Sequence, residues 1–368
     1  MNDAERRRAV YHFQKADHLP RLEFGIWNSA RTRWKNEGWN GDETLFKNDE
    51  SDGLTTHPLD LGWVDVPVFP RFKEELLKIE GNYKFERFYT GEIRMSPVDV
   101  PPERVMPVFV QAPVESKDDW YKIIKPRLDP ETPERWIDFE PKMAQVKAEC
   151  DSGERLLDAR CIGGYMYLRS LCGPEKLLYL FYDAPELLHD MMKTWLNLMV
   201  TCLTKVQDIQ PFFKFFMAED IAYKQRPLLS PKMAEEFLMP YYRDLIQTLR
   251  AGQKEYMHVE VDSDGNPDLL LPSYIKTGFT VFSPLEVAAG CDPIFIGDKY
   301  PELALYGGVD KRVLAQGKEQ IKRELDRIIP YMIKRRGFIP KCDHSVPDDV
   351  SFENFMFYRE YITSIDSF

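Results

Sequence analysis

After about residue 155, the chain alternates between short apolar runs and longer segments in which apolar residues recur with helical spacing. The short runs predict strands, which lie within residues 155–167, 211–221, 254–261, 279–286, 303–310 and 337–342. The longer segments predict helices within residues 173–207, 230–254, 267–278, 318–336 and 351–365, the first of them divided at Ala184 and Pro185. Strands and helices that alternate in this way are typical of a parallel sheet built from βα units.

The first 150 residues lack this regular alternation. Residues 1–13 predict an amphipathic helix, and residues 83–95 predict a hairpin of two strands that turns at Thr90 and Gly91. We therefore expect one domain over residues 1–368, in which residues 1–150 supply an N-terminal extension and a hairpin insertion.

Right-handed crossovers between parallel strands leave two main architectures, an open doubly wound sheet and a closed barrel. No G-x-G-x-x-G sequence and no phosphate-binding loop follows a predicted strand, which disfavours the nucleotide-binding open sheets. Polar clusters instead follow several different strands, and the loops after the strands build the active site of a TIM barrel. The predicted fold is therefore α/β, a (β/α)8 TIM barrel with an irregular N-terminal extension and a hairpin.

The composition limits the classes of partner. Of the 368 residues, 43% are hydrophobic, and the formal net charge is -11 without any basic block. These values indicate a folded chain with a full core and argue against binding to nucleic acid or to an anionic membrane surface. No apolar run reaches the length of a membrane span. The six cysteines are scattered without a CxxC pair, which indicates reduced thiols and a cytoplasmic protein.

Asp262 and Asp264 are the first candidates for chemistry. Residues i and i+2 of a strand face the same side, so both carboxylates can enter one site, with Glu260 below them in the barrel interior. His344, in the loop after the last predicted strand, would complete a metal or acid–base site. The alternative is an Asx turn, because Asp and Asn before glycine are common loop formers.

Further polar residues follow other strands. Glu219 and Asp220, with Tyr223 nearby, are candidates for catalysis and substrate binding, or they form a solvated cap at a strand end. Glu286 closes the run at 279–286 and would point into the same barrel mouth. Cys342 is either a soft metal ligand or a buried apolar residue.

Aromatic and cationic residues outside these groups are candidate substrate contacts. Arg31 and Arg33 would pair with a substrate carboxylate, although exposed arginines usually have no such role. The sequence contains no HExxH helix, no GxSxG elbow and no set of protein-kinase motifs. Several aromatic side chains would wall a pocket for a planar substrate, or would pack in the core: Trp27, Trp34, Trp39, Tyr165 and Tyr167.

Five stretches of the sequence, taken together and in order, resemble the uroporphyrinogen decarboxylase superfamily. They are residues 12–27, 261–266, 278–293, 303–315 and 337–362. The resemblance covers most of the chain and implies the barrel fold. True uroporphyrinogen decarboxylases carry an early RQAGRY motif that clamps the carboxylates of the substrate, and this chain has FGIWNSARTRW in its place. The chain therefore looks closer to the other branch, the corrinoid-linked methyltransferases.

That resemblance implies a metal site and a partner protein. The methyltransferase barrels hold zinc through an early His-x-Cys pair and a later Cys. Here the early pair falls on Asp262 and Asp264, the later position falls on His344 with Cys342 nearby, and Glu286 resembles a further acidic position. The implied zinc ligands are Asp262, Asp264, His344 and Cys342, and Glu286 is their acidic neighbour. The implied corrinoid is carried by a separate protein, because no part of this chain resembles a corrinoid-binding module.

The leading hypothesis is a methyltransferase that moves a methyl group from a small donor, such as a methoxylated aromatic, to that corrinoid protein with metal assistance. The alternatives are a decarboxylase whose smaller carboxylic acid is held by Arg31 or Arg33, and a barrel that binds a small molecule without turnover. A homodimer stays open as the assembly. The residues expected to be catalytic are Asp220, Asp262, Asp264 and Glu286, and those expected to contact the substrate are Trp27, Arg31, Tyr167, Glu219 and Tyr223.

Overall fold

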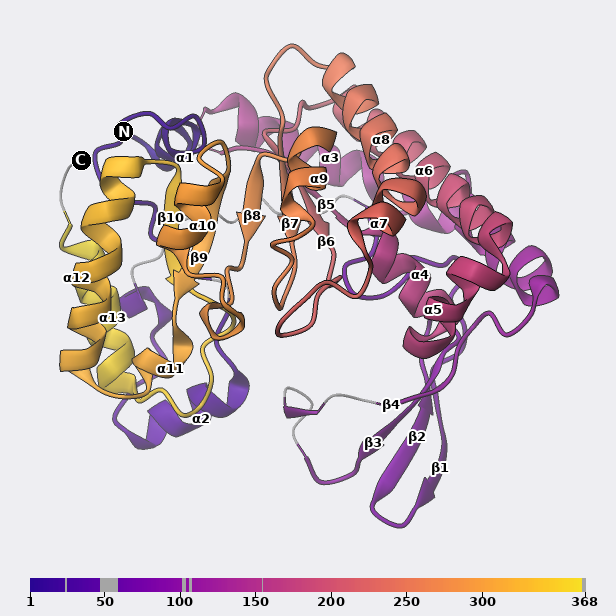
Figure 1. Cartoon of the computed structure of the whole chain (residues 1–368), viewed down its shortest axis with the longest axis horizontal. Coiled ribbons are helices and arrows are strands. Elements are labelled where there is room, and N and C mark those ends of the chain that lie inside the picture. The colour runs from indigo at the N-terminus through magenta and orange to yellow at the C-terminus, as the bar shows by residue number, and fades with distance from the viewer. Residues whose placement is uncertain (24, 47–58, 101–103, 106–107, 154, 366–368) are drawn as a thin grey trace.

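The larger of two sheets contains six parallel strands. The computed structural model describes the chain except for residues 24, 47–58, 101–103, 106–107, 154 and 366–368. Strand order in this sheet is β10-β9-β8-β7-β6-β5, so each strand pairs with its neighbours in the sequence (Figure 1). The strands are β5 (Asp158–Ile162), β6 (Lys214–Ala218), β7 (His258–Asp262), β8 (Val281–Ser283), β9 (Ala304–Val309) and β10 (Phe338–Cys342).

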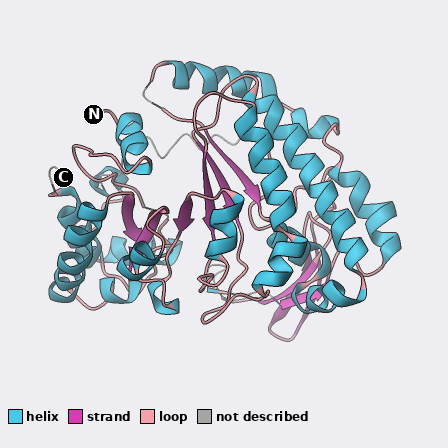
Figure 2. Cartoon of the chain, turned by 45° about the horizontal axis from the view of Figure 1, so that its top comes forward, coloured by secondary structure: helices cyan, strands magenta, loops and turns pink. Residues whose placement is uncertain are grey.

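Helices follow the strands and cover one side of this sheet (Figure 2). They are α4 (Gly164–Cys172), α5 (Pro174–Asp183), α6 (Pro185–Gln207), α7 (Pro231–Phe237), α8 (Met239–Ala251), α9 (Leu271–Thr277), α10 (Pro293–Lys299), α11 (Lys311–Leu314), α12 (Lys318–Arg335) and α13 (Phe352–Thr363). The 3-10 turn η7 (Val287–Ala289) lies between β8 and α10. None of the helices in the described ranges is both long and apolar enough to cross a bilayer.

Extended N-terminal segments lie along both edges of the sheet. At one edge, Trp27 donates its backbone N–H to Val346 at 3.1 Å, and Val346 donates to Gly25 at 2.9 Å. At the other edge, Ile162 of β5 donates to the carbonyl of Leu61 at 3.2 Å. The parallel α/β prediction is confirmed, and the six strands with their flanking segments are consistent with a (β/α)8 barrel.

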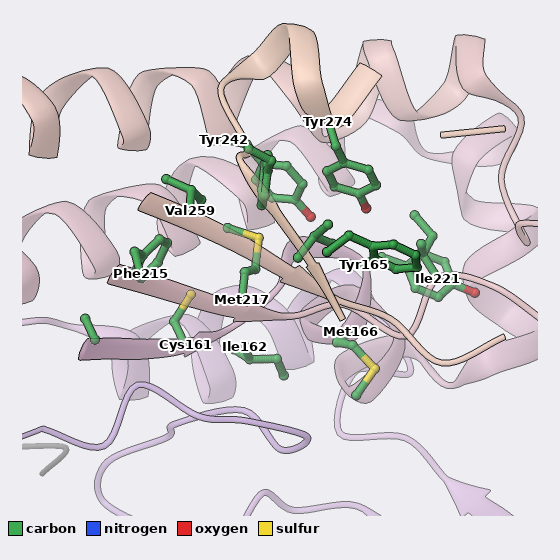
Figure 3. Close-up of a cluster of buried hydrophobic side chains, with 14 of the residues drawn as sticks. Cys161, Ile162, Tyr165, Met166, Phe215, Met217, Ile221, Tyr242, Val259 and Tyr274 are labelled. Carbon is green, nitrogen blue, oxygen red and sulfur yellow. The ribbon is translucent and has the colours of Figure 1, made fainter. Parts of the chain in front are cut away.

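The two faces of the strands carry different residues. The side chains that face the helices are apolar, and Phe215, Met217 and Val259 pack there against Tyr242 and Tyr274 (Figure 3). This alternation follows from the period of two in a strand, which sends successive side chains to opposite faces.

Helix α1 (Asp3–Tyr11) closes the inner face at the amino ends of the strands, where the buried charged residues Asp158 and Lys214 lie beside a small apolar cluster. Asn2 and Glu5 cap α1 with a reciprocal pair of hydrogen bonds. Tyr11 packs with Tyr306 and Ile339 in a separate apolar cluster. Tyr306 of β9 and Ile339 of β10 therefore lie on the inner face of the sheet, which α1 covers.

The smaller sheet confirms the predicted hairpin and extends it. Strands β2 (Tyr83–Arg87) and β3 (Ile93–Pro97) form the hairpin, flanked by β1 (Glu75–Glu80) and β4 (Val108–Gln111), and all pairs are antiparallel. This sheet projects from the side of the molecule toward which the strands of the larger sheet point (Figure 1). The remaining N-terminal elements are α2 (Asn28–Asn36), η1 (Glu43–Phe46), η4 (Asp119–Ile124), η5 (Lys125–Leu128), η6 (Pro133–Trp136) and α3 (Phe139–Asp151).

One predicted helix is wrong as a continuous element. Residues 230–254 form α7 and α8 with a break at Leu238, because Pro240 has no N–H to donate in a continuous helix. Ser230 caps α7 through Met233, as the sequence predicts. All six cysteines are free thiols.

Candidate active site

Loops after five strands bring charged side chains together at the carboxyl ends of the sheet. We call this group the carboxyl-end cluster. Its members are Asp220, Asp262, Asp264, Glu286, Lys311, Lys341, Asp343 and His344. Five of the predicted site residues therefore do meet, although they come from loops far apart in the sequence.

Asp264 lies between Asp220 and His344. Its backbone N–H donates to Asp220 Oδ1 at 3.1 Å, and its Oδ2 is 3.5 Å from His344 Nε2. Burial and the nearby charge of Asp264 raise the pKa of Asp220. Against the opposing effect of burial, the contact between Asp264 and His344 lowers the pKa of the carboxyl and raises the pKa of the imidazole. The structure thus favours a charged pair here.

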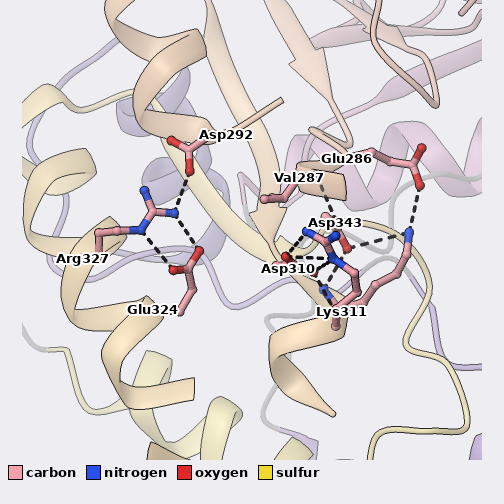
Figure 4. A network of polar contacts seen from close by, with 9 residues as sticks. Glu286, Val287, Asp292, Asp310, Lys311, Glu324, Arg327 and Asp343 are labelled. Atoms are coloured by element: carbon pink, nitrogen blue, oxygen red, sulfur yellow. Dashed lines mark hydrogen bonds and ion pairs between the residues drawn. The ribbon is translucent and has the colours of Figure 1, made fainter. Parts of the chain in front are cut away.

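Glu286 connects the turn after β7 to the loop after β9. Its carboxylate accepts the Gly265 N–H at 2.8 Å and pairs with Lys311 Nζ at 2.8 Å. Asp343 accepts the backbone N–H groups of Lys311 and Val287 (Figure 4). Gly265 has a φ of 77°, and a Cβ there would lie 2.7 Å from the Tyr223 carbonyl oxygen, so this turn requires glycine. These contacts fix the position of Asp264 beside the turn.

Asp262 shares the hydroxyl group of Ser283 with Glu260. Ser283 Oγ lies 2.6 Å from Asp262 Oδ2 and 2.6 Å from Glu260 Oε1. A hydroxyl has one proton to donate, so two ionised carboxylates cannot both accept from it. Lys214 pairs with Glu260, which places the extra proton on Asp262. Burial raises the pKa of Asp262 to about 7, in agreement with this assignment.

A buried ion-pair chain continues below Asp262 in the interior. Lys214 Nζ pairs with Glu260 and lies 3.6 Å from Asp158 Oδ2, and Arg7 donates to the same oxygen at 2.7 Å. Each of these side chains is almost fully buried. The expected place of Glu260 below the Asp pair is therefore confirmed.

Glu219 and Tyr167 do not lie where a substrate could touch them. Glu219 faces the helices, and its fully buried carboxylate accepts from Tyr242, from Tyr274 and from the backbone N–H of Tyr165 at the start of α4. Burial raises its pKa to about 7. Tyr167 is also fully buried, in α4. The prediction that these two side chains bind substrate is wrong, because the parity of β6 and the turn of α4 direct them into the core.

The other predicted substrate contacts lie at the surface or in ion pairs. Tyr223 is 75% exposed. Arg31 donates to Glu43 at 2.9 Å and to the Ile26 carbonyl. Trp27 is half-buried at the start of α2. Of the two alternatives for the aromatic residues, Trp34, Trp39 and Tyr165 follow packing in the core. Arg33 bonds Glu37 and the carbonyls of Asp348 and Asp349.

The proposed zinc ligands do not converge. Cys342 faces the large helix-side core, on the opposite face of β10 from Lys341, and burial raises the pKa of its thiol well above the usual range. Asp262 is held by Ser283, and Asp264 contacts His344. Within the described ranges, no group of three His, Cys, Asp or Glu side chains is arranged to hold a metal ion. The arrangement of these four side chains does not fit a zinc site. Zinc binding therefore has no support from this geometry and stays a prediction.

Four polar residues of this region were not singled out from the sequence. Ser283, Lys214 and Lys341 lie on inner-face positions of their strands, and Lys311 follows β9. Strand parity alone would have found the first three, since a polar residue at an inward position of a buried strand needs a partner there.

The family model for uroporphyrinogen decarboxylase (URO-D) matches residues 97–365, well over half of the chain. Among solved structures, a methyltransferase from Methanosarcina mazei matches with a TM-score of 0.58 and 12% sequence identity, over 99% of this chain and 100% of that chain. At this identity the structural match supports the shared fold alone. No curated protein matches the sequence. A match of this extent shows that the chain belongs to the uroporphyrinogen decarboxylase family.

Proposed function

We propose that this protein is a methyltransferase that takes a methyl group from a small methylated donor, such as a methoxylated aromatic compound, and passes it to a separate corrinoid protein. The fold is shared with a methyltransferase over nearly the full chain, so it is compatible with the general class. The early arginine motif of the decarboxylase branch is absent, which supports this branch over the other. Arg31 and Arg33, which the decarboxylase alternative needs, are engaged with other groups.

The observation that carries the proposal is the buried Asp262 at the carboxyl end of β7, which shares the Ser283 hydroxyl with Glu260. Removal of a methyl group from an ether leaves an oxygen that must gain a proton. Asp262 is 7% exposed, and its contact with the Ser283 hydroxyl, which Glu260 also shares, favours the protonated carboxyl. Asp262 can therefore donate this proton to the oxygen as a general acid. The reduced corrinoid of the partner supplies the nucleophile that accepts the methyl group.

The surrounding charges orient this acid and the donor. The ion pair of Lys214 with Glu260 keeps the negative charge on the far side of Ser283, so the proton stays on Asp262. Asp264 and His344 form the exposed part of the cluster, where they can contact polar groups of the donor. Lys311, fixed by Glu286, adds a positive charge near the site.

The test is methyl transfer from methoxylated aromatic donors to a reduced corrinoid protein, followed by the absorbance change of the corrinoid. The Asp262→Asn variant should lose about 100-fold or more in rate, the usual range for a general acid. Asp326→Asn, a surface change on α12, is the matched control and should keep full activity. Absence of transfer with every tested donor, or full activity in Asp262→Asn, would contradict the proposal. Donor binding without turnover would favour the binding-barrel alternative.

Zinc is tested separately by metal analysis of protein purified without added metal. About one zinc per chain, lost in Asp264→Ala, would support metal assistance at this site. No zinc in either protein would leave proton transfer by Asp262 as the chemistry of the site.

A further inference from the structure

A cleft of about 560 Å³ lies beside residues 59–65, and no member of the carboxyl-end cluster lines it. Its walls come from residues 59–71, from Tyr89, from residues 134–142 and from Arg160 of β5. Nothing in the proposed methyl transfer uses this cleft.

Arg160 offers unused hydrogen-bond donors in the cleft. Its guanidinium carbon lies 4.4 Å from the centroid of the Trp63 ring, and the side chain is half-buried. It makes no hydrogen bond or ion pair with any residue that the structure describes. An aromatic ring covers only the face of a guanidinium, so its N–H groups stay available along the edge, where they can grip a carboxylate or phosphate.

Arg135 is a second, independent cation in the same wall. The residue is 5% exposed, and it donates from Nε to Asp129 and from Nη2 to Arg127, both backbone carbonyls. Its buried Nη1 has no hydrogen-bond partner. Because Nη1 is itself buried, Arg135 contributes its positive charge to this wall and not a hydrogen-bond donor that reaches the cleft.

The described acidic residues of the cleft do not form ion pairs with Arg160 or Arg135. Asp60 pairs with Arg71 at 2.6 Å, and Asp65 pairs with Arg94 at 2.6 Å. The other two acids, Glu134 and Asp138, are exposed at the rim. Asp60 also acts electrostatically on Arg160 and Arg135, but neither arginine donates a hydrogen bond to an acid among the described residues of the cleft.

We propose that this cleft binds the oxyanion group of a small molecule, a carboxylate or a phosphate, at the unused donors along the guanidinium edge of Arg160. The aromatic rings of Trp63, Phe69 and Tyr89 line the same wall, and each already carries a guanidinium on one face. The site is distinct from the carboxyl-end cluster, so its occupancy does not depend on methyl transfer.

The test is titration of the full chain with benzoate and, separately, with inorganic phosphate, followed by calorimetry. At least one probe should bind saturably, and Arg160→Gln should weaken that binding at least 10-fold. Arg160→Lys should bind with intermediate affinity, because it keeps the charge but loses the paired donors. A preference for benzoate would identify organic carboxylates, and a preference for phosphate would identify phosphorylated compounds.

The matched control is Arg323→Gln, which removes one positive charge from the exposed face of α12 and should bind as the unchanged protein does. Circular dichroism and thermal melting confirm that each variant is folded. Failure of both probes to bind, or equal binding by Arg160→Gln and the unchanged protein, would overturn the proposal. Neither result would bear on the methyl-transfer assay, whose key variant lies at Asp262.

Discussion

Asp264 and His344 face each other across the carboxyl ends of β7 and β10, with 3.5 Å between Oδ2 and Nε2. This contact joins the two loops that the sequence places far apart along the chain. Both side chains are partly exposed, at 40% and 31%, so water screens their attraction. The pair contributes to stability only while both groups are charged.

The pH range of that contribution follows from the two pKa shifts. The raised pKa of His344 means that its contribution is complete below about pH 6.5 and is lost as pH rises through the folded-state value. The lowered pKa of Asp264 means that its contribution is present above about pH 4 and is lost in acid. His344→Gln should therefore destabilise the protein by about 0.5–1 kcal/mol at pH 5.5 and by much less at pH 9. Urea unfolding at both pH values measures this, and an equal loss at both would refute it.

Asp262→Asn should make the protein more stable as it makes it less active. The pKa of Asp262 is raised by burial to about 7, so the native state holds a proton that the unfolded chain releases at a lower pH. Stability therefore falls as pH rises from about 4 to 7. The uncharged amide avoids that loss and should raise the free energy of unfolding at pH 8 by roughly 1–3 kcal/mol. Urea unfolding at pH 8 beside Asp326→Asn tests this, and a less stable variant would contradict it.

The same proton predicts the pH profile of the reaction. A general acid must be protonated, so the rate of methyl transfer should decline above about pH 7, near the pKa of Asp262. The residual activity of Asp262→Asn should lack this decline. A rate profile of the unchanged protein that stays level through pH 9 would show that another group supplies the proton.

Lys214→Met should strongly destabilise the fold. Lys214 lies between Glu260 and Asp158, and its removal leaves two buried carboxylates with one fewer positive charge. Loss of one partner of a buried pair typically costs about 3–5 kcal/mol. Chemical unfolding gives the value, with the exposed Lys193→Met as the control. A combined Lys214→Met and Glu260→Gln variant should recover part of the loss, and no recovery would contradict the ion-pair explanation.

Gly163→Ala should disrupt the junction of β5 and α4. A Cβ at Gly163 would lie 2.0 Å from Glu219 Oε2 and 2.7 Å from the carbonyl oxygen of Ala218. Overpacking of this kind costs about 1–3 kcal/mol or more. Gly25→Ala is the control, because its Cβ would meet its nearest neighbour at an ordinary 3.5 Å. Equal melting temperatures for the two variants would contradict the close fit around Glu219.

The sequence predicts the sheet well because its strands are buried on both faces and its helices begin and end with clear signals. Ser230 with Pro231 starts α7, and Gly278 follows the end of α9, as expected. The break at Leu238 was missed because apolar spacing continues through it, although Pro240 marks it.

The site was predicted in part, for reasons that lie in the geometry of strands. Strand parity predicts the inward position of Asp262 on β7, whereas Asp264 lies beyond the end of that strand and contacts His344. Cys342 follows its alternative as a buried apolar residue, and Glu219 was misplaced as a substrate contact, because each stands one residue from the inward parity of its strand. The sharing of Ser283 by two carboxylates could not be predicted, since it depends on the register of β7 with β8.

Helix α1 also has a consequence for how the chain is made. The Tyr11 ring packs 5.2 Å from the ring of His258, and its apolar cluster also includes Ile339 near the end of the chain. Synthesis delivers α1 first, but the strands that receive it emerge hundreds of residues later. Helix α1 is therefore made well before it can complete its packing, and until β10 has been made its apolar side chains must be covered by other contacts.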